Sequence, residues 1–168
     1  MKTCEILTQL PTSGEYEEVV FGKDSGTFTR VKFSEPSASW VGVFQNGYYP
    51  SKKNQALLVA DYALVLAGGL LYLVDLQAKT AHILPSKDAI QSVIADEKQI
   101  FAAAFTSIEV FDYNGSLVKS LEGYYFDMFD FQSITTTEVA AQYYQAGGSW
   151  TSLRVDRRTL EISGKQAT

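Results

Sequence analysis

The sequence is poor in the residues that build metal sites and nucleophilic sites. Its 168 residues include one cysteine, Cys4, and one histidine, His82. A single cysteine excludes an internal disulfide and fits a reducing compartment. One His and one Cys cannot build the usual zinc sites, so we predict no catalytic metal. We interpret His82 as an edge-strand residue and Cys4 as a bystander thiol in a frayed terminus.

Several catalytic and cofactor-binding motifs are absent as well. The sequence has no Gly-x-x-x-x-Gly-Lys phosphate loop, no Gly-x-Gly-x-x-Gly dinucleotide motif and no Gly-x-Ser-x-Gly nucleophile elbow. A pair of carboxylates remains at Asp127 and Asp130, but residues three apart in a strand point to opposite faces. We therefore expect no cofactor and a non-enzymatic protein, with a carboxylate hydrolase as the least favoured function.

Basic charge and long apolar runs are also missing. The net charge is −5, so the chain lacks the attraction that drives binding to nucleic acids and to anionic membranes. The most apolar segment, 56–76, carries two aspartates and is interrupted by Gly68-Gly69, which indicates two strands and a turn. The first seven residues lack the apolar stretch of a signal peptide. We expect a cytoplasmic protein that binds neither nucleic acid nor membrane.

Alternating apolar runs and turn residues are abundant, and they follow a repeat. Three times an apolar run ends in an aspartate and a tight turn, after which a second apolar run begins. The aspartates Asp75, Asp112 and Asp156 lie roughly 40 residues apart, a period typical of repeats with several short strands. We predict that each aspartate accepts hydrogen bonds from backbone N–H groups of its turn.

The repeat suggests how the chain is organised. We predict a single all-β domain over 1–168, with a strand-like N-terminal segment at 1–37. Blade-like repeats of several short strands follow at about 38–84, 89–123 and 126–164. Many short strands with frequent turns are typical of all-β sandwiches, barrels and propellers.

The apolar-Asp steps Val74-Asp75, Phe111-Asp112 and Val155-Asp156 resemble the end of the third strand in propeller blades of the quinoprotein and WD-like type. The resemblance covers roughly residues 38–164, and the glycine common in that turn is present only at Gly115. It implies antiparallel blade-like sheets in an incomplete or small β-propeller-like fold, with an open β-sandwich as the alternative. Pairing of 17–21 with 160–163 would close the fold, and we favour a monomer over a homodimer.

Doubled tyrosines are the candidate binding residues. Tyr48-Tyr49 and Tyr124-Tyr125 each follow a glycine in an expected loop, where binding residues concentrate. Tyrosine is enriched at protein interfaces, although these rings could instead pack between sheets. The first function hypothesis is a protein-binding module, of which a cytoplasmic immunity-type inhibitor is one form. The alternative is a carbohydrate-binding or small-molecule-binding domain with a tyrosine platform.

Overall fold

A computed structural model describes residues 2–23, 26–36, 38–49, 53–145 and 147–164. These residues form sixteen strands and no helix, so the prediction of an all-β chain is confirmed. The described part of the chain therefore offers no helix with the length and apolarity of a membrane span. The chain divides into two compact units, unit 1 (Met1–Leu84) and unit 2 (Pro85–Thr168). The expected single domain stays a prediction.

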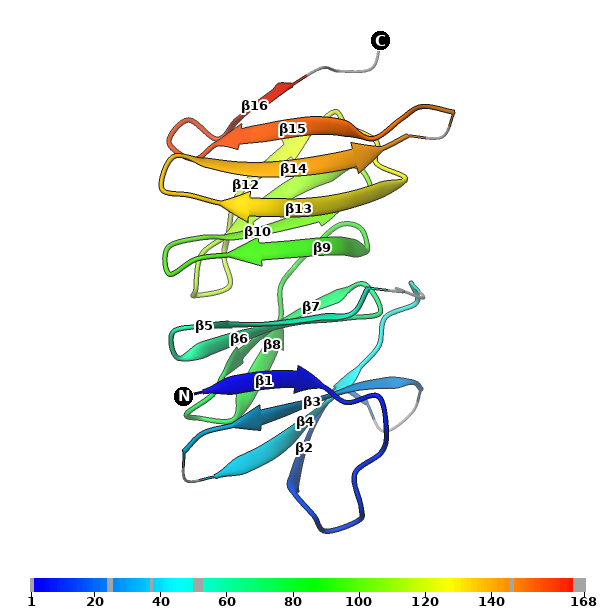
Figure 1. The fold of residues 1–168 in the computed structure, drawn as a ribbon, viewed down its shortest axis with the longest axis vertical. Helices are drawn as coiled ribbons and strands as arrows, with labels where there is room; N and C mark the ends of the chain where they lie inside the picture. Colours follow the sequence, from blue (N-terminus) through cyan, green and yellow to red (C-terminus); the bar gives the residue numbers. More distant parts are fainter. Residues whose placement is uncertain (1, 24–25, 37, 50–52, 146, 165–168) are drawn as a thin grey trace. The chain divides into compact units, whose positions relative to one another are not determined.

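Unit 1 contains two four-stranded sheets (Figure 1). The strands of the first, in spatial order, are β1 (Thr3–Ile6), β3 (Phe28–Ser34), β4 (Ser39–Gln45) and β2 (Glu17–Phe21). Those of the second are β5 (Gln55–Val59), β6 (Tyr62–Ala67), β7 (Leu70–Asp75) and β8 (Thr80–Ile83).

Unit 2 also contains two four-stranded sheets, and both are simple meanders. The first consists of β9 (Ile90–Ala95), β10 (Ile100–Ala104), β11 (Ser107–Phe111) and β12 (Leu117–Glu122). The second consists of β13 (Met128–Ile134), β14 (Glu138–Tyr144), β15 (Thr151–Asp156) and β16 (Glu161–Gly164).

The first sheet of unit 1 has an unusual connection. Strand β2 pairs with β4 in parallel, whereas every other strand pair of the described residues is antiparallel. Because β1 and β2 lie at opposite edges of the sheet, the connection 7–16 must cross one of its faces. Lys32 on β3 donates a hydrogen bond to the Tyr16 hydroxyl (2.8 Å), which fixes the end of this connection over the sheet.

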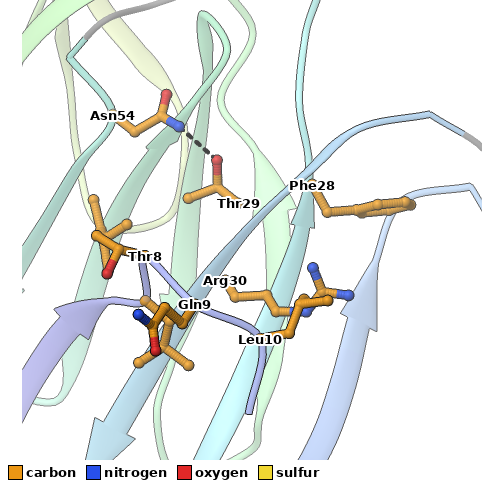
Figure 2. A pocket seen from close by; sticks show the side chains of 9 residues that line it. Thr8, Gln9, Leu10, Phe28, Thr29, Arg30 and Asn54 are labelled. Atoms are coloured by element: carbon orange, nitrogen blue, oxygen red, sulfur yellow. Dashed lines mark hydrogen bonds between the residues drawn. The ribbon is translucent and has the colours of Figure 1, made fainter.

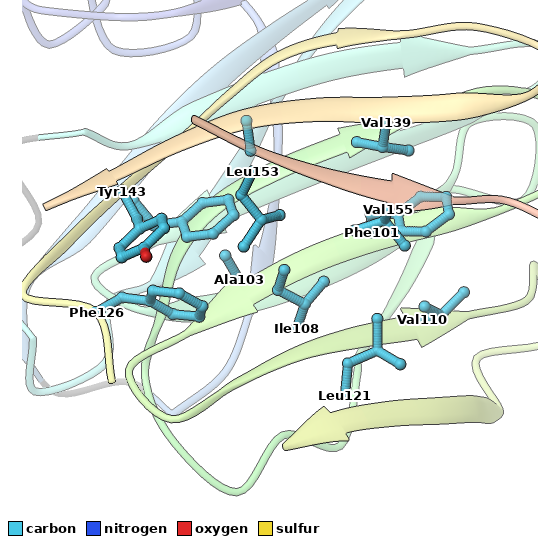
Figure 3. Close-up of a cluster of buried hydrophobic side chains, with 12 residues drawn as sticks. Phe101, Ala103, Ile108, Val110, Leu121, Phe126, Val139, Tyr143, Leu153 and Val155 are labelled. Atoms are coloured by element: carbon cyan, nitrogen blue, oxygen red, sulfur yellow. The ribbon is translucent and has the colours of Figure 1, made fainter. Parts of the chain in front are cut away.

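The two sheets of each unit pack through an apolar core. In unit 1 this core is rich in aromatic rings, with Phe33 and Trp40 4.5 Å apart between ring centroids and Phe44 5.2 Å from Tyr72. In unit 2 the core joins β10 and β11 to β14 and β15 (Figure 3). Its buried members are Phe101, Ala103, Ile108, Val110, Leu121, Phe126, Phe129, Val139, Ala141, Tyr143, Leu153 and Val155.

Strand membership in the N-terminal part differs from the sequence expectation. Segment 38–84 was expected to form one blade, but its first strand, β4, belongs to the sheet of β1, β2 and β3. The reason is that β1, which is only four residues long, and the edge strand β2 complete a sheet around β3 and β4. The connection after β4 thus leads from one sheet to the next.

One further expectation needs correction. Cys4 is not in a frayed end, because it lies in β1 opposite Phe33, and burial raises the pKa of its thiol. Pairing of 17–21 with 160–163 would join the two units and stays a prediction. His82 lies exposed on the edge strand β8, as predicted.

The three repeated aspartates have the predicted structural role. The Asp75 carboxylate accepts the backbone N–H groups of Gln77 (2.9 Å) and Ala78 (2.8 Å). The Asp112 carboxylate accepts those of Asn114 and Ser116, both at 2.9 Å. Asp156 accepts those of Arg158 (2.9 Å) and Thr159 (2.8 Å). These bonds fix the turns that follow β7, β11 and β15.

Replacing Asp112 by alanine should remove both bonds of its turn. We expect the free energy of unfolding to fall by about 1 kcal/mol, the usual effect of losing a side-chain cap. Asp112→Asn keeps the accepting oxygen and is the matched control. Urea unfolding of the two variants checks this, and an equal loss in both would contradict the capping role.

Candidate functional site

The first tyrosine pair lies at a small hollow of unit 1. Tyr48 is fully exposed, whereas Tyr49 is half-buried, and its backbone N–H donates to Gly68 O (3.2 Å). The hollow has a volume of about 270 Å³. A side chain at Gly47 would lie 2.4 Å from Gly68 O, so the two loops approach closely only because Gly47 is a glycine. The lining residues are Thr27, Asn46, Gly47, Tyr48, Tyr49, Asn54 and Gly68.

The polar side chains of this hollow are already paired with one another. Thr29 donates to Asn46 Oδ1 and accepts from Asn54 Nδ2, both at 2.6 Å. The other ends of the two amides bond to Thr27 Oγ1 (3.2 Å) and to Gly68 N (3.1 Å). Sugar binding needs polar groups that are free to bond the ligand. These amides instead hold loops together, so the geometry gives the carbohydrate alternative no support here.

The second tyrosine pair is divided between core and surface. The Tyr124 ring stacks on Phe126 with 5.8 Å between centroids and packs against the core of unit 2. Tyr125 is 56% exposed, and its carbonyl accepts the side-chain amide of Gln145 (2.9 Å). Of the four tyrosines singled out in the sequence, Tyr48 and Tyr125 therefore offer an open ring. The two pairs belong to different units.

Exposed apolar side chains gather at the end of the β13–β16 sheet, next to the point where the chain at Tyr125 is held by Gln145. Met128 is the register partner of Tyr144 and is 46% exposed. The Tyr144 ring lies 6.1 Å from the ring of Trp150, which is also 46% exposed. Asp127 N donates to Tyr144 O (3.0 Å), which holds the chain after Tyr125 against the end of β14. We call Tyr125, Met128, Tyr144 and Trp150 the aromatic surface.

An acidic side chain lies on the same face as Met128. Asp130 is two residues after Met128 in β13 and therefore shares its face of the sheet. Asp130 is half-buried and accepts a hydrogen bond from the Gln132 amide (2.9 Å). Its carboxylate thus adds negative charge to the face that carries the aromatic surface. Asp127 precedes Met128 in the sequence and is also half-buried.

The sequence identified Tyr125 as a candidate binding residue, and it also showed the doubled tyrosines Tyr143-Tyr144, but it missed Met128 and Trp150. Met128 and Trp150 belong to no recognisable motif. They were not considered as binding residues, because an isolated methionine or tryptophan near a strand end is more often buried. The available signal was the alternation in β13, which places Met128 and Asp130 on the face opposite Phe129. Trp150 could be found only through its neighbour Tyr144.

A second feature of unit 2 is a buried arginine at the opposite end of the same sheet. The Arg157 guanidinium bonds both carboxylate oxygens of Asp96, at 2.9 Å and 2.7 Å, and the carbonyl of Thr135. It joins the turn after β9 to the turns after β13 and β15. A hollow of about 620 Å³ lies beside it, lined by Lys98, Gln99, Thr136, Thr137, Asp156, Arg157 and Arg158.

Asp96 makes this end of unit 2 sensitive to acid. Burial alone would raise its pKa. The Arg157 guanidinium and the backbone N–H groups of Lys98 and Gln99 outweigh burial and hold the pKa below its ordinary value. A carboxyl whose pKa is lower in the folded state stabilises the fold above its unfolded pKa, and this contribution is lost as pH falls through the folded value.

We therefore expect the stability of unit 2 to decrease as the pH falls below about 4, the ordinary pKa of an aspartate. Asp96→Asn should be less stable than the wild type at neutral pH and should show a shallower loss on acidification. Urea midpoints measured from pH 7 to pH 3 test this. Parallel pH profiles for the two proteins would contradict it.

Comparison with known proteins identifies the fold. The sequence matches no protein-family profile and no curated protein sequence. The structure is similar to the N-terminal domain of Nup159, with a TM-score of 0.57, 12% identity, and coverage of 86% of this chain and 46% of that one. It is also similar to a prolyl endopeptidase, with a TM-score of 0.56, 11% identity, and coverage of 83% and 23%.

A third similar chain comes from the complex in which S. cerevisiae Dbp5 is bound to Nup159, with a TM-score of 0.52, 12% identity, and coverage of 96% and 47%. This chain thus spans about half or less of these neighbours. These three chains are 11–12% identical to this one, so the likeness concerns the fold alone. The fold is therefore propeller-like, with four four-stranded sheets, of which all but the first are fully antiparallel within the described residues.

Proposed function

We propose that the protein is a non-enzymatic binding module that holds a protein partner on the aromatic surface of unit 2. The observation that carries this proposal is the grouping of exposed Met128 and Trp150 around Tyr144 at one end of a sheet, next to the chain that carries the exposed Tyr125. Clustered apolar side chains on a surface mark interaction sites, and Tyr, Trp and Met are enriched at interfaces. Trp and Tyr also supply much of the binding energy in many interfaces.

The charge of the surface favours a partner with a basic patch. Asp130 shares the face of β13 with Met128, and the whole chain carries a net charge of −5. Opposite charges at the margin of an interface accelerate association and reject wrong partners. An immunity-type inhibitor that covers the basic site of a toxin would have these properties. We include this inhibitor function in the proposal. We also propose a cytoplasmic location, for which the support comes from the sequence alone.

Affinity capture from extracts of the source cells, with matched variants, tests the proposal. The double variant Met128→Ser/Trp150→Ser removes two exposed side chains of the aromatic surface. Leu117→Ser/Val118→Ser removes two comparably exposed side chains of edge strand β12 and is the control. We expect one or a few proteins to be retained by the wild type and the control and lost from the double variant. Equal retention by all three would refute the aromatic surface as the binding site.

A further inference from the structure

Arg30 occupies an unusual position in unit 1. It lies in β3, opposite Val43 of β4, and the backbone of Leu7 donates to its carbonyl (2.9 Å). This bond continues the β1–β3 ladder by one residue, so the chain after β1 still lies beside β3 at Arg30. In the view of Figure 2 the Arg30 side chain extends from β3 toward the side of Leu10 and Phe28.

The Arg30 guanidinium lacks the partners that an arginine usually finds. Its Nε is buried and has no hydrogen-bond acceptor among the described residues. Among the described residues Arg30 also forms no ion pair. By contrast, ion pairs are formed there by Lys2, Lys79, Lys87, Arg154 and the buried Arg157. A buried donor without an acceptor is destabilising, so such groups usually have a bound partner in the working protein.

The surroundings of Arg30 form a hollow suited to a small ligand. The hollow has a volume of about 270 Å³ and is bounded on one side by the segment 7–10. Thr8 and Gln9 are exposed and contribute a hydroxyl and an amide to its rim, while Leu10 and Phe28 contribute apolar surface. The hydroxyl of Thr29 is occupied by Asn46 and Asn54, so the free polar groups come from Thr8, Gln9 and Arg30.

We propose that this hollow binds a small oxyanion, a phosphate or a carboxylate, on the Arg30 guanidinium. Planar guanidinium groups bind such anions through two parallel hydrogen bonds, one of which can come from Nε. Thr8 and Gln9 can donate further bonds from the rim. The site lies in unit 1 and does not depend on the protein-binding proposal.

Because Nε is buried, a ligand can reach it only when a side chain that lines the hollow shifts. Leu10 is 74% exposed, so little burial is lost when its side chain shifts. A bound oxyanion would hold the segment in place by bonding to Thr8 and Gln9. The ligand should therefore protect this segment as well as Arg30.

Isothermal titration with inorganic phosphate, and separately with acetate, at constant ionic strength tests the proposal. We expect saturable binding of at least one anion by the wild type, and the arm that binds identifies the source of the oxyanion. Arg30→Gln should weaken this binding by about tenfold or more, as expected for loss of charge-assisted hydrogen bonds. Arg154→Gln changes the net charge equally on an exposed residue of unit 2 and should bind like the wild type.

Hydrogen exchange of the segment 7–10 provides a second measurement, which remains informative if Arg30→Gln is poorly folded. Exchange there should slow in the wild type when the binding anion is added. Absence of saturable binding of both anions would overturn the proposal. Equal binding by Arg30→Gln and Arg154→Gln would overturn it as well.

Discussion

Phe126→Ala should destabilise unit 2 by about 3–5 kcal/mol, the usual cost of removing a fully buried aromatic ring. The Phe126 ring contacts Phe129 and Tyr143, with centroids 4.8 Å and 5.3 Å away, and stacks on Tyr124. Its backbone N–H donates to Phe105 O (2.8 Å), and its carbonyl accepts the Gln91 amide (2.9 Å). The ring therefore fills the core at the point where the second sheet of unit 2 begins.

The neighbouring variant Tyr125→Ala is the matched control. Tyr125 is exposed, so its removal should change the free energy of unfolding by no more than about 0.5 kcal/mol. Urea unfolding followed by circular dichroism compares the two proteins. A large loss of stability in Tyr125→Ala would show that this ring supports the fold, and it would weaken the case that the ring is kept exposed for binding.

Arg157→Ala should have the second largest effect. It removes both bonds to the Asp96 carboxylate and the bond to the Thr135 carbonyl. Breaking a buried ion pair leaves one charge unpaired. Because the Asp96 side chain is 33% exposed, water can replace part of the loss, and we expect a decrease of about 2–3 kcal/mol.

Arg158→Ala is the matched control for this prediction. Arg158 follows Arg157 directly but is exposed, and its backbone N–H, which caps the turn at Asp156, remains in the variant. Thermal unfolding should place Arg158→Ala close to the wild type and Arg157→Ala well below it. Similar midpoints for the two variants would contradict the role of Arg157 as a link between turns.

Local features were predictable from the sequence. Strand β13 can be recognised in the sequence, because alternation and a following turn specify it within a few residues. The Asp75, Asp112 and Asp156 turns were predicted because a cap needs only the next few residues. Two of these turns are harder to recognise in the sequence, because they have no glycine at the position of positive φ. Lys79 (51°) and Leu160 (53°) occupy that position instead.

Features that depend on distant partners were not predictable. Strand β4 belongs to the first sheet because β1 and β2 complete that sheet. Nothing in the sequence of β1 or β2 indicates which strand each of them pairs with. Arg157 and Arg158 look alike in sequence, but only Arg157 meets Asp96, 61 residues away. The aromatic surface likewise depends on the pairing of Met128 with Tyr144.

Site-specific photo-crosslinking tests the central claim, a protein-binding surface on a propeller-like fold, most directly. A photoreactive residue would replace Met128 on the aromatic surface in one protein and Val118 on edge strand β12 in another, since both side chains are exposed. After irradiation in extracts of the source cells, we predict a discrete cross-linked protein at position 128 and none at position 118. Absence of a product at 128, or the same products at both positions, would contradict the claim.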